Sequence, residues 1–383
     1  MRAPQFAVRL VMLTAVLLLT GGVAQVMPAA AAVRTGSEVP AAAFTVSGSL
    51  SAVAATSAGN AWAVGSSGSG ALIARWNGAA WKRVPSPAPA GSRLSGVAAT
   101  SARNAWAVGC SGCSGTGVEK PVILRWNGTA WKLVPSPSLA GALSSVAATS
   151  AGNAWAVGST SAGKSLIERW NGTAWKRVSS PSPGSWAYLG GVAASSAGNA
   201  WAVGSTFSGG LTGANRTLIL RWNGTAWKQV PSPSPYLNQG LADFLGGVAV
   251  TSADSAWTVG DANCGCGPGI NVTERWNGTA WKLVPSPSPG GGAALSGVAA
   301  VSARTVWAVG VTGSGDGPQK TLTLWWNGSG WKRIPSPSPG ATASLSAVAA
   351  TSARNAWAVG STSAANHGNP ETLILRWNGK AWS

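Results

Sequence analysis

A tryptophan-centred pentapeptide, Ala-Trp-Ala-Val-Gly or a close variant, recurs seven times along the chain. Its tryptophans lie 44 to 56 residues apart, at positions 62, 106, 155, 201, 257, 307 and 357. Each copy precedes a second motif, Arg-Trp-Asn-Gly-x-Ala-Trp-Lys or a variant, with tryptophans at 76/81, 126/131, 170/175, 222/227, 276/281, 326/331 and 377/382. These positions account for 21 of the 23 tryptophans. Such a chain is expected to fold as an array of seven similar units, each packed against its neighbours.

Each unit contains four short apolar runs, which are Leu143–Ala148, Ala154–Gly158, Leu166–Trp170 and Ala174–Val178 in the third unit. The last two runs are joined by Asn-Gly, the strongest short hairpin signal. Four antiparallel strands repeated at this period are typical of β-propeller blades. The sequence therefore predicts an all-β, seven-bladed β-propeller over residues 50–383, with blades starting near 50, 94, 143, 189, 245, 295 and 345.

Side chains become larger along each unit, from alanine, glycine, serine and valine in the first run to tryptophan in the last. The gap between two radiating sheets widens outward in the same way, so we expect the first strand to line the axis and the indoles to fill the outer gap. Arginines of the third run can stack on these indoles, and the lysine after each third tryptophan can protect an edge strand. A basic belt that touches an anionic polymer is the alternative role for these cations.

The two ends of the chain are expected to meet. The seventh unit stops at Trp382-Ser383, where its fourth strand should continue, and Glu38-Val39-Pro40 resembles the Val-Pro before other first strands. We expect residues 34–40, within an N-terminal segment 33–49, to complete or cover the last blade and so protect its edge. A chain truncated in its seventh unit would have the same sequence pattern.

The N-terminus has the features of a secretory signal peptide. Arg2 and Arg9 precede an apolar run, and a small-residue stretch follows it, which predicts cleavage near Ala32. An uncleaved anchor is the alternative. The formal net charge of +18 becomes +16 without the two arginines, and the chain has only nine carboxylates. A basic, secreted protein favours anionic partners such as cell-wall polymers, acidic glycans or lipid headgroups, whereas nucleic acid is not expected outside the cell.

The order Leu-Ser-x-Val-Ala, Ala-Trp-Ala-Val-Gly, Leu-Ile-Leu-Arg-Trp-Asn-Gly and Ala-Trp-Lys-x-Val-Pro resembles the repeats of tectonin-type propeller lectins over Leu50 to Ser383. It is more loosely similar to kelch and Asp-box (sialidase-like) propellers and to secreted bacterial proteins with the Trp-Asn-Gly signature. The Asp-box carboxylate and the kelch double glycine are absent here. The tectonin resemblance implies binding of sugars or cell surfaces.

The loops between second and third strands should lie on one face of the ring together with the connectors between blades. These loops vary in length, and five aromatic residues outside the repeat fall on this variable face around blade four. With nearby polar residues they form a candidate ligand site, which consists of Trp186, Tyr188, Phe207, Asn215, Arg216, Tyr236, Asn238, Gln239, Asp243 and Phe244. The alternative is that long loops only need a small apolar plug of their own.

Cysteines and possible catalytic residues are few. Cys110 and Cys113 are expected to form one local disulfide, and Cys264 and Cys266 a second, more strained one, because the chain is predicted to be exported. A zinc site that joins the four cysteines is the alternative. His367 is the only histidine, which rules out a multi-histidine metal site. Carboxylates on the variable face are scattered over several blades, at Glu119, Asp243, Asp261, Asp316 and Glu371.

These observations favour a secreted, monomeric, non-catalytic binding module that recognises carbohydrate or a cell-surface polymer through the variable face around blade four, with proteins as further partners. A wall-associated scaffold that binds anionic polymers through its basic rim is the second hypothesis, and a glycoside hydrolase is the third. The sequence predicts no cofactor, no metal, no nucleic-acid partner and no stable membrane insertion after signal cleavage.

Overall fold

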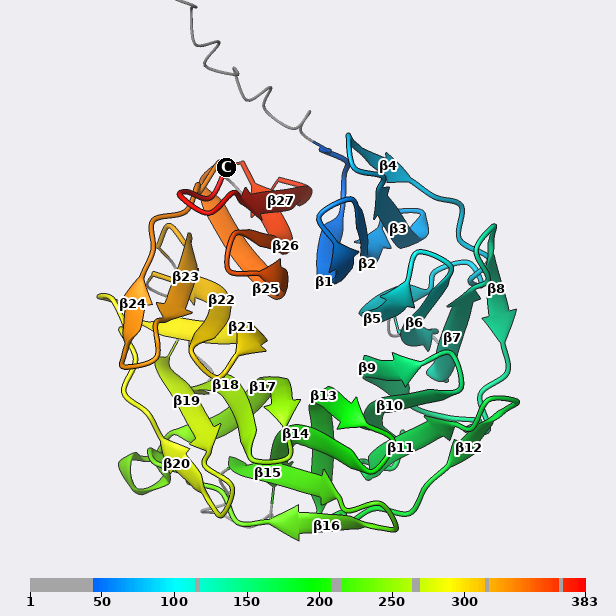
Figure 1. Cartoon of the computed structure of the whole chain (residues 1–383), viewed down its shortest axis with the longest axis horizontal. Helices are drawn as coiled ribbons and strands as arrows, with labels where there is room; N and C mark the ends of the chain where they lie inside the picture. The colour runs from blue at the N-terminus through cyan, green and yellow to red at the C-terminus, as the bar shows by residue number, and fades with distance from the viewer. Residues whose placement is uncertain (1–43, 114–117, 208–214, 264–268, 314–316, 365–367) are drawn as a thin grey trace, which may run out of the picture. The chain divides into compact units, whose positions relative to one another are not determined.

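The computed structural model describes residues 44–113, 118–207, 215–263, 269–313, 317–364 and 368–383. The chain divides into two units, Met1–Val39 and Pro40–Ser383, and all described residues belong to the second. This unit consists of seven antiparallel sheets arranged in a ring (Figure 1). The predicted all-β, seven-bladed propeller is confirmed. No helix in the described residues is long and apolar enough to cross a membrane.

In six blades four strands are hydrogen-bonded in chain order, and the seventh sheet has three strands in the described residues, with an isolated bridge between Trp377 and Trp382 at its outer edge. The first strands are β1 (Ser49–Ser57), β5 (Arg93–Ser101), β9 (Ala142–Ser150), β13 (Trp186–Ser196), β17 (Ala242–Ser252), β21 (Ala293–Ser302) and β25 (Thr342–Ser352). The second strands are β2 (Asn60–Ser67), β6 (Asn104–Ser111), β10 (Asn153–Ser159), β14 (Asn199–Phe207), β18 (Ser255–Asn263), β22 (Thr305–Thr312) and β26 (Asn355–Ser363).

The outer strands are shorter. The third strands are β3 (Gly70–Trp76), β7 (Lys120–Trp126), β11 (Ser165–Trp170), β15 (Asn215–Trp222), β19 (Ile270–Trp276), β23 (Lys320–Trp326) and β27 (Glu371–Trp377). The fourth strands are β4 (Trp81–Arg83), β8 (Trp131–Val134), β12 (Trp175–Arg177), β16 (Trp227–Val230), β20 (Trp281–Leu283) and β24 (Trp331–Arg333). A short 3₁₀ helix, η1 (Leu237–Gln239), precedes β17.

The first strands line a narrow channel at the axis, with a volume of about 160 Å³ and walls of serine, glycine, alanine and valine. Neighbouring first strands approach so closely that a Cβ added to Gly96 would lie 2.8 Å from the Cα of Ser145. The small residues of the first run are therefore needed where the blades converge.

Each interface between blades is filled by three indoles. Trp62 of the first blade packs on Trp126 and Trp131 of the second, with ring centroids 4.8 and 5.0 Å apart. The same grouping recurs at every interface, as in Trp106 with Trp170 and Trp175. Because these rings are almost completely buried, the repeated tryptophans serve to pack the blades together.

Arginines of the third strands clamp neighbouring blades. The guanidinium of Arg169 lies 4.8 Å from the ring centroid of Trp155 in its own blade and 5.4 Å from that of Trp222 in the next. It also donates a hydrogen bond of 3.2 Å to the backbone oxygen of Ala197, which accepts a second one from Nε1 of Trp222. The sixth blade has Trp325 in this position, and its ring lies 6.3 Å from that of Trp307.

The Asn-Gly pairs form the turns between third and fourth strands. Oδ1 of Asn171 accepts hydrogen bonds from the backbone amides of Thr173 and Ala174, both at 3.0 Å. Gly172 has a φ of 101°, which disfavours residues with a side chain. The Asn-Gly-Thr sequences therefore follow from turn chemistry.

The ring closes between the first and seventh blades. Trp357 of the seventh blade packs on Trp76 and Trp81 of the first at 4.8 and 5.2 Å, as at the other interfaces. The segment 44–48 lies beside the start of β27, where the amide of Thr372 donates to the oxygen of Val46 at 3.0 Å. Ser383 exchanges two backbone hydrogen bonds with Arg376 beyond the outer edge of β27. Residues 34–40, which we expected to close the ring, lie outside the described residues.

Candidate functional site

Connectors between blades are hydrogen-bonded to the loops between second and third strands. The amide of Gly141 in a connector donates to the oxygen of Glu119 at 2.9 Å, and the amide of Gly313, in the loop after β22, donates to the oxygen of Gly292 in the connector before β21 at 3.1 Å. Both kinds of segment therefore share one face of the ring, as strand parity requires. This is the face that carries the predicted ligand site.

Four of the five aromatic residues outside the repeat line one pocket on this face. The pocket has a volume of about 320 Å³ and is lined by Trp186, Tyr188, Ser205, Phe207, Asn215 and Phe244. Three of these residues stand in one row across blade four, because Trp186 pairs with Phe207 and Phe207 with Asn215. Tyr188 and Ser205 form the next row on the same side of the sheet. Phe244 comes from β17 of blade five.

Trp186 and Tyr188 belong to a strand, although we expected them in a connector. β13 and β17 begin at Trp186 and Ala242, three residues before the expected blade starts. They start early because the second strands that pair with them are long: β14 and β18 have nine residues each, whereas β10 has seven. A longer second strand offers backbone partners to a longer first strand. The aromatic side chains are therefore mounted on a sheet.

The backbone around Trp186 is held on both sides. The amide and the hydroxyl of Ser185 donate to the oxygen of Phe207 at 2.9 and 3.0 Å. The hydroxyl of Thr206 donates to the oxygen of Trp186 at 3.0 Å, and Nζ of Lys164 donates to the oxygen of Ser185 at 3.3 Å. These bonds fix the position of the indole before any ligand arrives.

Gly163 supports the indole itself. A Cβ added to this glycine would lie 1.8 Å from Cδ1 of Trp186, so only glycine lets the indole rest against the loop of blade three. The sequence did not single out Gly163, Lys164 or Ser205. Ser205 could have been found from the strand register, since it stands opposite Tyr188.

The two largest rings of the pocket are exposed to solvent. Trp186 is 55% exposed and Tyr188 is 38% exposed, whereas the tryptophans of the repeat are 9% exposed or less in the core. A plug would shield its own rings from water. Exposed aromatic residues on a rigid support have the properties of a ligand site instead.

The other candidate residues lie elsewhere. Tyr236 is partly buried and packs into the core between blades four and five. Arg216 stands on the opposite side of the sheet from Asn215, because neighbouring residues of a strand alternate, and it lines a separate cavity of about 400 Å³ beside Leu237. Gln239 is exposed in η1. Asn238 is in η1, but its side chain is outside the description.

Asp243, another of the expected ligand residues, does not line the aromatic pocket. Its side chain is completely buried, because the early start of β17 turns it into the interface with blade four. Burial and the charge of Asp261 raise the pKa of Asp243 to about 6, against the opposing effect of the Tyr236 and Leu237 amides. These two amides are near, but neither reaches hydrogen-bonding geometry with a carboxylate oxygen of Asp243.

Glu274 is a second buried carboxyl group at this interface. It is completely buried, and neither of its carboxylate oxygens has a hydrogen-bond partner in the described residues. Burial, followed by the charge of Asp243, raises its pKa to about 8. Asp261 lies on β18, the strand next to that of Glu274, with its side chain on the opposite face of the sheet, and burial raises its pKa as well. Asp243 and Glu274 are too enclosed to act on a ligand in the aromatic pocket.

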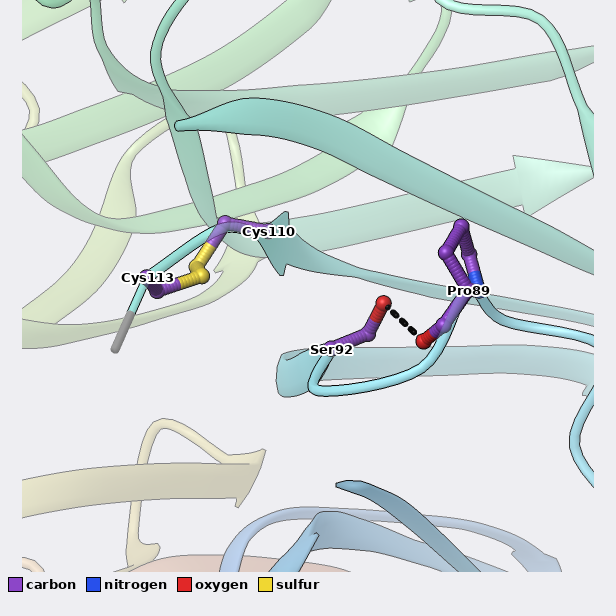
Figure 2. The surroundings of a disulfide bond; sticks show 4 residues. All are labelled: Pro89, Ser92, Cys110 and Cys113. Carbon is purple, nitrogen blue, oxygen red and sulfur yellow. Dashed lines mark hydrogen bonds between the residues drawn. A yellow bond between two sulfur atoms is a disulfide. The ribbon is translucent and has the colours of Figure 1, made fainter. Parts of the chain in front are cut away.

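Cys110 and Cys113 form a disulfide at the end of β6, with their Cα atoms 6.1 Å apart (Figure 2). Nearby, the hydroxyl of Ser92 donates to the oxygen of Pro89 at 2.6 Å in the connector that enters the same blade (Figure 2). The expected pair Cys264 and Cys266 lies outside the described residues.

The comparisons with known proteins establish the fold. No family model matches the chain, and no curated protein matches it. Among solved structures, it is similar to YCF48 bound to D1 peptide, with 16% identity, a TM-score of 0.53 and coverage of 87% of this chain and 95% of that one. It is also similar to YCF48 from Cyanidioschyzon merolae, with 18% identity, a TM-score of 0.50 and coverage of 85% and 96%. At these identities the similarity shows a shared propeller fold, and the tectonin resemblance stays a prediction.

Proposed function

We propose that this protein is a non-catalytic binding module whose blade-four pocket receives an apolar or aromatic side chain of a peptide ligand. The observation that carries the proposal is the exposure of Trp186 and Tyr188 on a backbone that is already fixed. Binding residues held in place before the ligand arrives lose little conformational entropy on association.

The composition of the pocket favours a peptide. Its side chains offer few hydrogen-bonding groups, namely Ser205, Asn215, the hydroxyl of Tyr188 and the indole N–H of Trp186, and four of its six residues are aromatic. An apolar anchor fits such a pocket, and a few polar groups suffice to orient the adjoining peptide backbone. A structural neighbour, YCF48, has been observed with a bound D1 peptide.

A random peptide library displayed on phage tests the proposal. We expect the selected peptides to share an aromatic or long aliphatic residue, and a labelled synthetic copy to bind the purified protein. Trp186→Ala and Tyr188→Ala should each weaken this binding about tenfold or more, since hot-spot aromatics contribute about 2 kcal/mol or more. Leu139→Ala is the matched control, because Leu139 is 86% exposed and belongs to another connector. Equal binding by all four proteins would refute the role of the pocket.

Carbohydrate is the second candidate ligand, because exposed Trp186 and Tyr188 can stack on the apolar face of a sugar ring. A glycan array probed at low and high salt tests it. Saturable binding that tolerates salt and is lost in Trp186→Ala would support a lectin-like function, whereas no binding to any glycan would remove it.

We also propose that the protein is exported through its N-terminal signal peptide. The basis is the arrangement of Arg2, Arg9, the apolar run and the small residues up to Ala32. N-terminal sequencing of the protein from the culture medium should start near residue 33. Retention of the intact N-terminus in the cell fraction would contradict export.

A further inference from the structure

Exposed cations concentrate on the outer strands of the propeller. Six fourth strands begin with a buried tryptophan followed by an exposed lysine, and these lysines are Lys82, Lys132, Lys176, Lys228, Lys282 and Lys332. Three of the strands add an exposed arginine, at Arg83, Arg177 and Arg333. We call these nine residues the basic rim. The six strands contain no carboxylate.

The basic rim lies far from the aromatic pocket. Each fourth strand starts directly after the turn between third and fourth strands, which is on the face opposite the variable loops. The same end of the ring carries further exposed cations, Arg103, Arg304, Arg354 and Lys380. Asp254 is the exposed carboxylate in the corresponding turn of blade five.

The acidic groups of the chain do little to offset this charge. Glu168, Asp243 and Glu274 are completely buried. Glu119 and Glu371 are exposed, but they lie at the start of third strands, beside the variable face. The positive potential is therefore strongest around the outer rim at the end remote from the pocket.

We propose that the basic rim binds a linear polyanion, that is, a polymer with repeated phosphate or carboxylate groups. The fourth strands are the outermost strands of their sheets, so their lysines are distributed around the circumference, one in each of six successive blades (Figure 1). A flexible chain that follows the rim can contact several of them at once.

A flat bilayer fits this arrangement less well. A bilayer that approaches the end of the ring meets the turns first, and the exposed turn cations belong only to blades two, six and seven. Asp254 of blade five would face the same bilayer. Around the circumference, in contrast, the lysines recur without an intervening acid on the fourth strands.

Two charge-matched variants test the proposal. The rim variant combines Lys82→Gln, Lys132→Gln and Lys176→Gln. The control variant combines three exposed cations of the variable face, Arg93→Gln, Lys120→Gln and Lys320→Gln, which removes the same net charge. All six positions are exposed, and circular dichroism verifies that both variants are folded. The probes are inorganic polyphosphate, polygalacturonate, and phosphatidylcholine vesicles with and without phosphatidylglycerol.

We expect the unmodified protein to bind one or both polymers with an affinity that falls steeply with added salt. The rim variant should bind about tenfold or more weakly, and its plot of log K against log salt should be shallower by about 2, since three phosphate contacts are lost. The control variant should keep the original affinity within about twofold.

Three results would overturn the proposal. Equal losses in the two variants would show that net charge alone attracts the polymer. Binding to anionic vesicles without binding to either polymer would assign the rim to a membrane. Absence of polymer binding at low salt would leave the lysines with only the protective role that charged edge strands have. Because neither variant alters the aromatic pocket, peptide binding serves as an independent readout of that site.

Discussion

Replacing Glu274 by glutamine should remove most of the pH dependence that this buried carboxyl imposes on stability. Its carboxylate has no hydrogen-bond partner in the described residues, and its strand neighbour Thr258 uses its hydroxyl for the oxygen of Gly247. Burial and the charge of Asp243 raise the pKa of Glu274 from 4.5 to about 8. The folded protein therefore binds this proton more tightly than the unfolded chain does.

The sign of the effect follows from this difference. The folded state is most favoured below pH 4.5, where Glu274 is protonated in both states. It loses stability as the pH rises from about 4.5 to about 8, and the loss levels off above that range. Each unit of pKa corresponds to about 1.4 kcal/mol, so this one group costs about 4 kcal/mol between pH 5 and pH 9. Asp243, with its pKa raised to about 6, acts in the same direction at lower pH.

Urea titrations at pH 5, 7 and 9 measure the free energy of unfolding at each pH. Unfolding is monitored by tryptophan fluorescence and by circular dichroism, and the two signals should give the same transition. Glu274→Gln should leave the free energy of unfolding nearly unchanged at pH 5 and raise it by about 3 to 5 kcal/mol at pH 9. Glu274→Leu should stabilise the fold as well, because equivalent positions of four blades hold leucine, at Leu124, Leu220, Leu324 and Leu375.

Glu119→Gln is the control for loss of a carboxylate at an exposed position, where a substitution should change the free energy of unfolding by about 0.5 kcal/mol or less. Parallel pH profiles for the unmodified protein and Glu274→Gln would refute the reasoning, since they would mean that the carboxylate is solvated or hydrogen-bonded in solution.

Three further predictions concern packing. Gly163→Ala should displace the Trp186 indole and weaken peptide binding as Trp186→Ala does. Gly91→Ala is the control, because Gly91 has a similar φ of 70° but a Cβ added there would have no atom within 4 Å, and it should not affect binding in the same titration. Arg169→Ala should lower the free energy of unfolding by about 2 kcal/mol through loss of its ring contacts and its bond to Ala197, as measured by urea titration; no change would mean that the clamp is passive. Trp357→Ala should cost about 3 to 5 kcal/mol, because it removes the indole that packs the seventh blade on the first, and a smaller loss would argue against ring closure in solution.

The architecture could be predicted because each structural requirement appears seven times in the sequence. First strands made of small residues, paired tryptophans and Asn-Gly turns each meet one geometric requirement of a blade. Because each feature recurs from blade to blade, a single substitution does not obscure the pattern. Trp325 replaces the clamp arginine, and its ring packs on Trp307 without disturbing the sixth blade. The order of strands and the assignment of loops to faces then follow from parity.

The details of the site could not be predicted because they depend on strand length. The extended β14 and β18 draw the residues before Leu189 and Leu245 into strands, and strand alternation then decides which side chains face the pocket. This alternation exposes Trp186, buries Asp243 and sends Arg216 to the other side of its sheet. A sequence shows which residues lie near blade four. A shift of one residue in the register of a strand, however, moves each of its side chains to the other face of the sheet.

Blade five contributes Phe244 to the aromatic pocket. It departs from the repeat at buried positions, with Thr258 in place of alanine and with Asn271, Thr273 and Glu274 in its third strand. Such polar substitutions cost local stability, which six more regular interfaces can offset through their indoles and arginines. Functional sites tend to lie where a fold departs from its own rules. The aromatic pocket lies at the junction of blades four and five, whereas the basic rim follows the repeat itself, and the two proposed binding surfaces can change independently.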